Sequence, residues 1–279
     1  MDMRTATEGR SHVTRYLERP EGRIAYDVSG EGPLVICAPG MGDLRQVFRF
    51  LAPELVEAGC RVATMDLRGH GESDATFSAY DDVAAASDLL ALVEHLGGPA
   101  VLVGSSMSAG AAVLAAAERP DLVSGLVLAG PFVRNAPVGL AQRVAFRLGL
   151  LRPWGPAAWN AWYAKLYPGR PPADLDGHRA RIRDLHRRPE RWRAFVATTR
   201  TSHAPAEARL GDVRAPALVV MGERDPDFPD PAAEAVFVAE RLNAEVLIVP
   251  NAGHYPQAEY PEIVTPAVVR FLEGVARRA

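Results

Sequence analysis

The chain has 279 residues, is 48% hydrophobic and 23% charged, and carries a formal net charge of −3. This length allows one large hydrophobic core, or one core with an inserted segment, and the composition excludes a disordered or fibrous protein. Only two cysteines are present, Cys37 and Cys60. Both lie in apolar runs, which excludes a disulfide framework and indicates small core residues in a reducing compartment.

The first twenty residues contain no apolar stretch of the secretory type, and no run approaches the length of a membrane span. We therefore expect a soluble, cytoplasmic protein that does not contact a membrane.

Short apolar runs alternate with helical stretches at both ends of the chain. In chain order the predicted strands are Val13–Leu17, Arg23–Val28, Leu34–Ala38, Arg61–Met65, Ala100–Val103, Val123–Ala129, Ala217–Met221 and Glu245–Val249. The predicted helices are Gln46–Glu57, Tyr80–Leu96, Met107–Glu118, Ala232–Leu242 and Tyr260–Arg278. The later strands are continuous runs of Val, Leu and Ile, as expected for strands buried on both faces.

This alternation predicts an α/β fold with an eight-stranded, mostly parallel, doubly wound sheet. The first two strands are joined by a short turn around Pro20-Glu21-Gly22, so the N-terminal edge of the sheet should be antiparallel. Residues 131–205 interrupt the pattern with Pro-punctuated helical pieces and no strand signal. We interpret them as a helical lid inserted into a core formed by residues 1–130 and 206–279.

The predicted lid is basic, whereas the rest of the chain is acidic. From Arg134 to Pro205 there are thirteen arginines and one lysine against four acidic residues, a net charge of +10 that leaves −13 elsewhere. Such asymmetry indicates a segment with its own surface or partner. An acidic carrier protein is one candidate partner. We expect a solvated, salt-bridging helix face rather than binding to nucleic acid.

A tight strand-to-helix turn is the most informative local feature. It reads Gly104-Ser105-Ser106-Met107-Ser108 and follows the strand that ends at Val103. Small residues at such a turn are typical of a nucleophile elbow, in which a strained residue projects its side chain outward at a helix N-terminus. The end of the strand favours Ser106 as the nucleophile. Ser108, with Gly110 two residues later, is the alternative.

Two further candidates follow the last two predicted strands. Asp225 lies just after the seventh strand and His254 just after the eighth. In a doubly wound sheet the chemistry is found at the carboxyl ends of the strands. A serine hydroxyl needs a base such as histidine, and a carboxylate orients that base. Asp227 and Asp230 compete with Asp225 for the acid role but lie further along the loop.

The order Ser, Asp, His resembles the α/β-hydrolase fold. The resemblance spans nearly the whole chain and is carried by residues 104–108, Gly222-Glu223-Arg224-Asp225, Gly253-His254, residues 66–73 and the loop Pro39-Gly40-Met41-Gly42. It implies an oxyanion hole formed by the backbone N–H groups of Met41 and Met107. This chain has Pro39 where the family usually has His. The resemblance also makes His70 a structural hydrogen-bonding residue rather than a second base.

We expect neither a cofactor nor a metal. No Cys/His cluster has zinc-ligand spacing, and the glycines at positions 40 and 42 do not complete a dinucleotide-binding fingerprint. A serine at the elbow, instead of aspartate, also argues against a dehalogenase or an epoxide hydrolase.

These features predict a serine hydrolase that cleaves an ester, thioester or lactone of a small-to-medium apolar substrate through an acyl-enzyme. The candidate substrate-binding residues are Gly40, Trp154, Trp159, Trp162 and Tyr255. One alternative is a carbon–carbon bond hydrolase that binds a carboxylate through Arg188 or Arg193, although that family usually has Trp where Tyr255 stands. A cyclase, a lyase or a binding protein that performs no net hydrolysis is the other.

Overall fold

The computed structural model describes residues 13–135 and 139–278. The described residues form one eight-stranded sheet with the strand order β1-β2-β4-β3-β5-β6-β7-β8. The strands are β1 (Arg15–Arg19), β2 (Gly22–Ser29), β3 (Leu34–Ala38), β4 (Arg61–Met65), β5 (Ala100–Ser105), β6 (Val123–Ala129), β7 (Ala217–Gly222) and β8 (Glu245–Val249). The eight predicted strands and the predicted fold class are confirmed.

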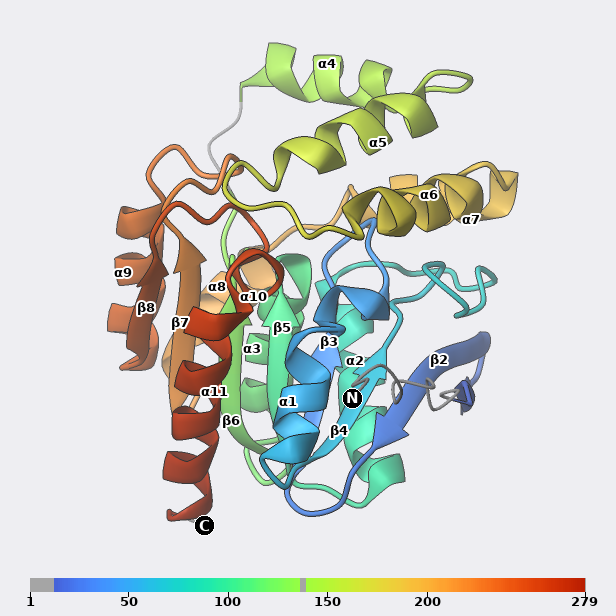
Figure 1. The fold of residues 1–279 in the computed structure, drawn as a ribbon. Helices are drawn as coiled ribbons and strands as arrows, with labels where there is room; N and C mark the ends of the chain where they lie inside the picture. The colour runs from blue at the N-terminus through green and yellow to red at the C-terminus, as the bar shows by residue number, and fades with distance from the viewer. Residues whose placement is uncertain (1–12, 136–138, 279) are drawn as a thin grey trace, which may run out of the picture.

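Strand β2 is antiparallel to both of its neighbours, whereas β4, β3, β5, β6, β7 and β8 run parallel to one another. The antiparallel N-terminal edge predicted from the short turn is therefore confirmed. Because the six parallel strands run in one direction, their carboxyl ends lie at a single edge of the sheet (Figure 1).

Helices cover both faces of the sheet (Figure 1). One face carries α1 (Leu51–Glu57) and α11 (Pro261–Ala276), and the other carries α2 (Asp82–Leu96), α3 (Met107–Glu118), α8 (Ala204–Arg209) and α9 (Pro231–Leu242). Short α10 (Pro256–Glu259) and the 3₁₀ turns η1 (Arg45–Phe48) and η2 (Leu210–Asp212) complete the connections. No helix in the described ranges is long and apolar enough to cross a bilayer.

The predicted helix Gln46–Glu57 is divided in the structure. A 3₁₀ turn covers Arg45–Phe48, and the α-helix begins at Leu51. Pro53 accounts for the division, because proline has no N–H to donate and its ring clashes with the carbonyl four residues earlier. It is tolerated only in the first turn of a helix, where the structure places it.

Among the described residues five α-helices lie between β6 and β7, and the first four of them extend above the carboxyl ends of the strands (Figure 1). These four are α4 (Leu140–Gly149), α5 (Gly155–Lys165), α6 (Leu175–His186) and α7 (Pro189–Thr198). We refer to residues 131–205 as the helical insertion. The division of the chain into a core and a lid stays a prediction, and its residues 1–12, 136–138 and 279 lie outside the described ranges.

Buried hydrogen bonds between histidine and aspartate side chains connect the helical insertion to the core. His178 Nε2 lies 2.7 Å from Asp43 Oδ1, and His203 Nδ1 lies 2.7 Å from Asp82 Oδ2. Both histidines belong to the insertion and both aspartates to the core. Each buried aspartate thus has a hydrogen-bond partner from the insertion, and removal of that partner would leave a buried polar group unsatisfied.

Candidate active site

Ser106 lies at the junction of β5 and α3 in a strained backbone conformation. Its φ is 56° and its ψ is −123°, values that residues with a Cβ atom seldom adopt. A Cβ atom on Gly104 would overlap the backbone of Ser108, and one on Gly40 would lie 2.7 Å from the Ser106 Cβ. The turn can therefore close only with glycine at these two positions.

The two neighbouring serines differ from Ser106 in environment. Ser108 is fully buried inside α3, and its hydroxyl donates a hydrogen bond of 2.5 Å to the Pro39 carbonyl. Ser105 is also buried, and its hydroxyl has no partner among the described residues. The outward-turned conformation expected of a nucleophile elbow thus occurs at Ser106, which is the first of the two sequence candidates.

Asp225 and His254 meet at the carboxyl ends of β7 and β8. The Asp225 Oδ2 atom lies 2.7 Å from His254 Nδ1, and both side chains are almost completely buried. The Asp227 carboxylate lies further from that nitrogen, at 3.8 Å. Asp230 accepts a hydrogen bond from the Ala233 N–H and caps α9. Of the three aspartates considered, the structure brings Asp225 closest to the histidine.

One short segment after β6 contacts both Ser106 and His254. The Ser106 N–H donates to the Ala129 carbonyl at 2.8 Å, and the Phe132 N–H donates to the Ser106 carbonyl at 3.2 Å. The Phe132 ring lies 5.9 Å from the His254 ring, and a Cβ on Gly130 would touch the same imidazole at 3.0 Å. The serine and the histidine therefore lie close to the same segment at the carboxyl ends of the strands. We refer to this region, around Ser106 and His254, as the corner.

The loop after β3 approaches this corner and is fixed by hydrogen bonds. The Gly42 N–H donates to His70 Nε2 at 2.9 Å, and His70 Nδ1 lies 2.8 Å from the Arg68 carbonyl. Since a carbonyl only accepts, Nδ1 carries the hydrogen and Nε2 is free to accept. Burial lowers the pKa of His70 and favours this neutral form. His70 is thus a structural hydrogen-bonding residue, as the resemblance implied.

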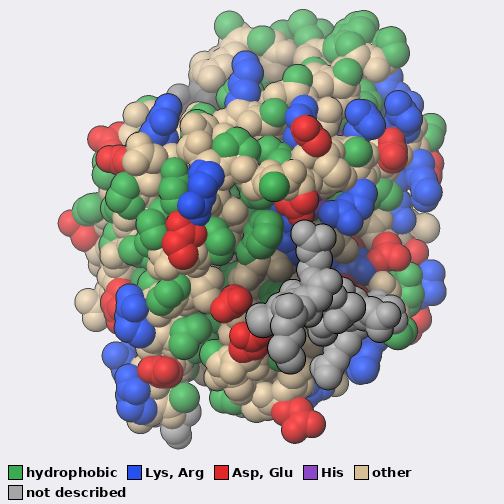
Figure 2. Space-filling model, in the orientation of Figure 1, with side chains coloured by type: hydrophobic (Ala, Val, Ile, Leu, Met, Phe, Trp, Pro, Cys, Tyr) green, Lys and Arg blue, Asp and Glu red, His purple; other side chains and the backbone are tan. Residues whose placement is uncertain are grey.

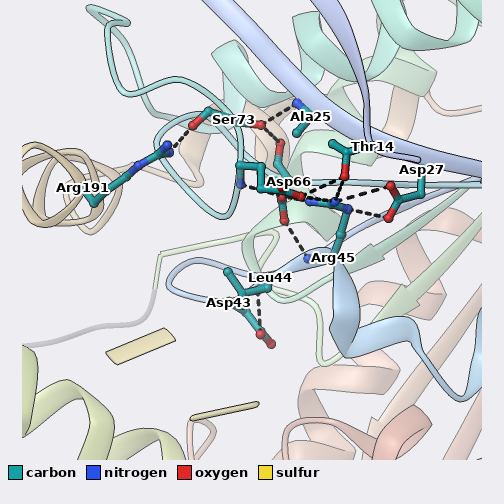
Figure 3. A network of polar contacts seen from close by, with 10 residues as sticks. Thr14, Ala25, Asp27, Asp43, Leu44, Arg45, Asp66, Ser73 and Arg191 are labelled. Carbon is teal, nitrogen blue, oxygen red and sulfur yellow. Dashed lines mark hydrogen bonds and ion pairs between the residues drawn. The ribbon is translucent and has the colours of Figure 1, made fainter. Parts of the chain in front are cut away.

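A buried ionic cluster around Arg45, which follows this loop in the sequence, anchors the end of the loop (Figure 3). The Arg45 Nε donates to Asp27 at 2.7 Å, its guanidinium also contacts Asp66, and its backbone N–H donates to Asp66 Oδ1 at 2.8 Å. Burial opposes the charge of Arg45, but the Asp66 and Asp27 carboxylates outweigh it and raise the pKa of the guanidinium. These contacts tie the end of the loop that carries Met41 to the core.

The two residues expected to form the oxyanion hole, Met41 and Met107, both lie next to residues that contact or adjoin Ser106. Met107 is the first residue of α3, so its N–H has no acceptor within the helix. Met41 lies in the turn between Gly40, which packs on Ser106, and Gly42, which is held by His70. This places both predicted oxyanion-hole residues beside Ser106.

The electrostatics of His254 favour its charged form. Burial lowers its pKa, but the charge and hydrogen bond of Asp225, with smaller contributions from Asp227 and Asp43, outweigh burial and raise it to about 9. This histidine therefore mostly carries its proton at neutral pH, and the neutral form that can accept a proton increases as the pH approaches 9.

Comparisons with known proteins identify the family to which this fold belongs. A model of the alpha/beta hydrolase family matches residues 35–267. The chain belongs to the alpha/beta hydrolase family. It is 32% identical over 269 residues to a 2-(acetamidomethylene)succinate hydrolase of Mesorhizobium japonicum, covering 91% of this chain and 93% of that protein.

Esterases are also among the proteins that are similar to this chain. A pimeloyl-[acyl-carrier protein] methyl ester esterase of Neisseria meningitidis is 32% identical over 252 residues, covering 85% of this chain and 92% of its own. An esterase from Thermogutta terrifontis has a similar structure, with a TM-score of 0.74, 26% identity, and coverage of 95% of this chain and 99% of that one.

The predicted substrate-binding residues of this alpha/beta hydrolase separate into two groups. Gly40 packs on Ser106, Trp159 lies over Gly42, and Tyr255 is buried directly after His254. Trp154 is 53% exposed and Trp162 39% exposed, so the structure does not bring these two to the corner. The reason is helical geometry: the inward face of α5 is taken by Trp159 and Tyr163, four residues apart.

Two aromatic residues beside His254 were not among the candidates proposed from the sequence. Phe132 and Phe228 pack on each other at 4.7 Å between ring centroids, and their rings lie 5.9 and 6.5 Å from the His254 ring. Phe132 follows β6 by three residues and Phe228 follows Asp225 by three, so their positions just after strand ends could have identified them.

Asp225, Asp227 and His254 are close enough to be considered as metal ligands, since one ligand atom from each lies within 4.8 Å of the others. The nearest histidine nitrogen, Nδ1, is already hydrogen-bonded to Asp225. The arrangement is explained by an acid–base pair.

Proposed function

We propose that this alpha/beta hydrolase is a serine hydrolase that cleaves a carboxylic ester, thioester or lactone of a small-to-medium apolar substrate. The observation that carries the proposal is the strained Ser106 at the β5–α3 turn, with His254 and Asp225 joined at 2.7 Å on the same sheet edge. The comparisons support hydrolase chemistry in general, and the geometry supports these residues as its agents.

The reaction begins with attack of Ser106 Oγ on the carbonyl carbon while His254 Nε2 takes the hydroxyl proton. Nε2 is the acceptor because Nδ1 is committed to Asp225. The N–H groups of Met41 and Met107 stabilise the negative oxygen of the tetrahedral intermediate. Loss of one such donor typically raises the activation barrier by about 2.7–4 kcal/mol. His254 then protonates the leaving alcohol or thiol as its bond to carbon breaks.

A water molecule completes the cycle. His254 removes a proton from it, the hydroxide adds to the acyl carbon, and the second tetrahedral intermediate expels Ser106 Oγ, which regains the proton from His254. The products are a carboxylic acid and free enzyme. In a lactone the leaving hydroxyl stays attached to the acid.

The surroundings of the site favour an apolar acyl group. Phe132 and Phe228 pack beside His254, and Trp159 with Phe195 closes over Gly42. Only 6% of Ser106 is exposed, and we infer that the helical insertion acts as a lid that moves when substrate enters. Arg188 and Arg193, considered for a carbon–carbon bond hydrolase, are both exposed, which weakens that alternative.

Three serines within four residues provide a matched test on a generic aryl ester. Ser106→Ala should abolish turnover. Ser105→Ala should leave it within about threefold, because the lost hydroxyl has no hydrogen-bond partner. Ser108→Ala should retain turnover at a reduced rate, since it loses the bond to Pro39. Undiminished activity of Ser106→Ala would refute the proposal.

A second candidate is a substrate presented by an acidic carrier protein. Helix α4 has no buried residue, and Leu140, Val144, Phe146 and Leu148 are each 47–78% exposed. Figure 2 shows hydrophobic side chains gathered at this end of the molecule, with Lys and Arg beside them. No acidic residue occurs from position 135 to position 173. An apolar helix face flanked by arginines complements an acidic, partly apolar partner.

The carrier hypothesis is tested by charge reversal on α4. Arg143→Glu combined with Arg147→Glu should raise KM for an acyl group attached to an acidic carrier protein about tenfold or more, and leave KM for a small aryl ester unchanged. Reversal of Arg277 and Arg278, at the end of α11, is the matched control. Equal KM values for both double variants would exclude α4 as the docking face.

A further inference from the structure

The carboxylate of Asp43 lies at the point where the oxyanion-hole loop meets the helical insertion. It is fully buried. Its Oδ1 accepts hydrogen bonds from the Leu44 N–H and from His178 Nε2, both at 2.7 Å, and its Oδ2 accepts one from the Tyr163 hydroxyl at 2.8 Å. In Figure 3 this carboxylate points away from the Arg45 cluster.

Asp43 is close in sequence or space to each part of the catalytic machinery. It follows Met41 by two residues, on the loop that supplies one oxyanion-hole N–H. Tyr255 directly follows His254 and stacks on Tyr167 at 5.1 Å, and the Tyr167 hydroxyl lies 3.1 Å from that of Tyr163. Burial, and next the Asp43 charge, raises the pKa of Tyr255, so this ring lies within the electrostatic reach of the carboxylate.

The hydrogen bonds to Asp43 depend on closure of the helical insertion. Tyr163 belongs to α5 and His178 to α6, whereas the carboxylate belongs to the core. When α5 and α6 move away, the carboxylate loses the hydrogen bonds from Tyr163 and His178, and water can take their place. These two side chains therefore fix the position of the carboxylate, and of the loop that carries it, only while α5 and α6 are seated.

We propose that Asp43 is a positioning residue that couples seating of the helical insertion to the geometry of the oxyanion-hole loop and of His254. When substrate entry is complete and α5 and α6 return, Tyr163 and His178 bind the carboxylate and fix the loop that carries Met41. The catalytic geometry is thus completed only under a closed insertion. This inference rests on the proposed hydrolase function.

A second buried Asp–His pair provides a matched control. His203 Nδ1 lies 2.7 Å from Asp82 Oδ2, again between the helical insertion and the core, and Thr201 adds a hydrogen bond to Asp82. Asp82 begins α2 and is not part of the oxyanion-hole loop. Loss of this pair should weaken attachment of the insertion near His203, while the hydrogen bonds of Tyr163 and His178 to Asp43 still seat α5 and α6.

The test compares Asp43→Asn with Asp82→Asn in the full chain on a generic aryl ester. We expect Asp43→Asn to lower kcat about tenfold or more with KM within about threefold, since loosened positioning penalises the transition state more than binding. Asp82→Asn should lower the melting temperature but keep kcat within about threefold.

The pH profile separates positioning from a merely structural role. The charged groups that act on His254 are Asp225, Asp227 and Asp43, all negative. Removing the Asp43 charge should move the limb of the kcat/KM profile that reports His254 to lower pH. Asp82→Asn should leave that limb in place. His178→Gln keeps both the carboxylate and a hydrogen-bond donor, and should retain the wild-type limb and most of kcat.

Each outcome decides the question. If wild-type protein hydrolyses no ester and reacts with no serine-directed probe, the proposed function fails. If wild-type protein is active and Asp43→Asn matches Asp82→Asn in kcat and in pH limb, the role of Asp43 is overturned. If Asp43→Asn does not fold, Tyr163→Phe removes one donor and should lower kcat at least threefold; an unchanged kcat overturns the proposal equally.

Discussion

The carbonyl of Leu166, at the end of α5, accepts a hydrogen bond of 2.9 Å from the backbone N–H of His254. The loop that carries the candidate base is therefore held by the helical insertion and not by the core alone. A second link runs through Glu259, whose carboxylate accepts from the N–H groups of Gly253, Gly169 and Arg170 at 2.5, 2.9 and 3.1 Å. The two contacts join residues 166–170 to the residues around His254.

Gly253→Ala tests this connection. A Cβ at position 253 would overlap Pro168 and the Leu166 carbonyl, so the variant must separate the insertion from the His254 loop. We expect kcat on an aryl ester to fall about tenfold or more while the core remains folded. Circular dichroism and steady-state kinetics measure the two effects. Wild-type kcat in a folded Gly253→Ala protein would contradict the link.

The pH dependence of activity follows from the raised pKa of His254. The base must be neutral to accept the serine proton, and its pKa is about 9, so kcat/KM should rise with pH up to a limb near 9. Asp225→Asn removes the main charge that raises this pKa, so the limb should move to lower pH. It should also lower kcat by about 10³–10⁴-fold, because the imidazole loses its orienting partner.

Asp227→Asn is the control for that experiment. Its carboxylate lies 3.8 Å from His254 Nδ1 and contributes less than Asp225. A smaller shift of the limb and a modest loss of kcat are expected. If the two aspartate variants were interchangeable, the assignment of Asp225 as the orienting acid would be wrong.

Gly104→Ala should prevent the nucleophile turn from closing. Its Cβ would overlap the backbone carbonyl of Ser108, which is part of α3 and cannot move independently. We expect a loss of several kcal/mol in the free energy of unfolding, as for other overpacked core positions. Gly177→Ala, at an exposed position in α6 where a Cβ meets nothing within 4 Å, should instead stabilise by about 0.5–1 kcal/mol. Urea denaturation measures both.

His186 makes folding stability depend on pH on the acidic side. Burial, and next the charge of His70, lowers its pKa to about 3, and the ring packs between Trp192 and Phe195. The unfolded chain takes up this proton near pH 6.5. The stabilisation is therefore complete above about 6.5 and is lost as pH falls toward 3, by about 1.4 kcal/mol per unit.

His186→Phe should remove this dependence while keeping an aromatic ring in place. Between pH 6 and pH 4 the free energy of unfolding should fall less steeply in the variant than in wild-type protein. The two slopes should differ by the uptake of about one proton, or about 1.4 kcal/mol per pH unit. Denaturant titrations at the two pH values give the comparison. Parallel slopes would show that His186 is not a source of acid sensitivity.

The sheet could be predicted from the sequence because each parallel strand is a continuous apolar run. Leu34–Ala38 and Val123–Ala129 are found with the predicted bounds, since burial on both faces leaves a signal in every residue. The strand-to-helix turn at Ser106 could also be predicted from the sequence, because the steric need for glycine at position 104 is local. Ser106, Asp225 and His254 could each be proposed from their places after strand ends.

The tertiary partners of these residues could not be predicted. No local pattern indicates that Leu166 bonds to His254 or that Asp43 faces His178, 135 residues away. The tryptophans show the same limit: Trp159 and Trp162 look alike in sequence, but one faces inward and the other is 39% exposed. Helical periodicity identifies faces but not which face meets the core.

The most direct test of the account is the site of covalent labelling by a fluorophosphonate, mapped by peptide mass spectrometry. The account predicts a single adduct on Ser106 in wild-type protein, its loss in Ser106→Ala, and its retention in Ser105→Ala and Ser108→Ala. An adduct on Ser108, or no adduct on a correctly folded protein, would contradict it.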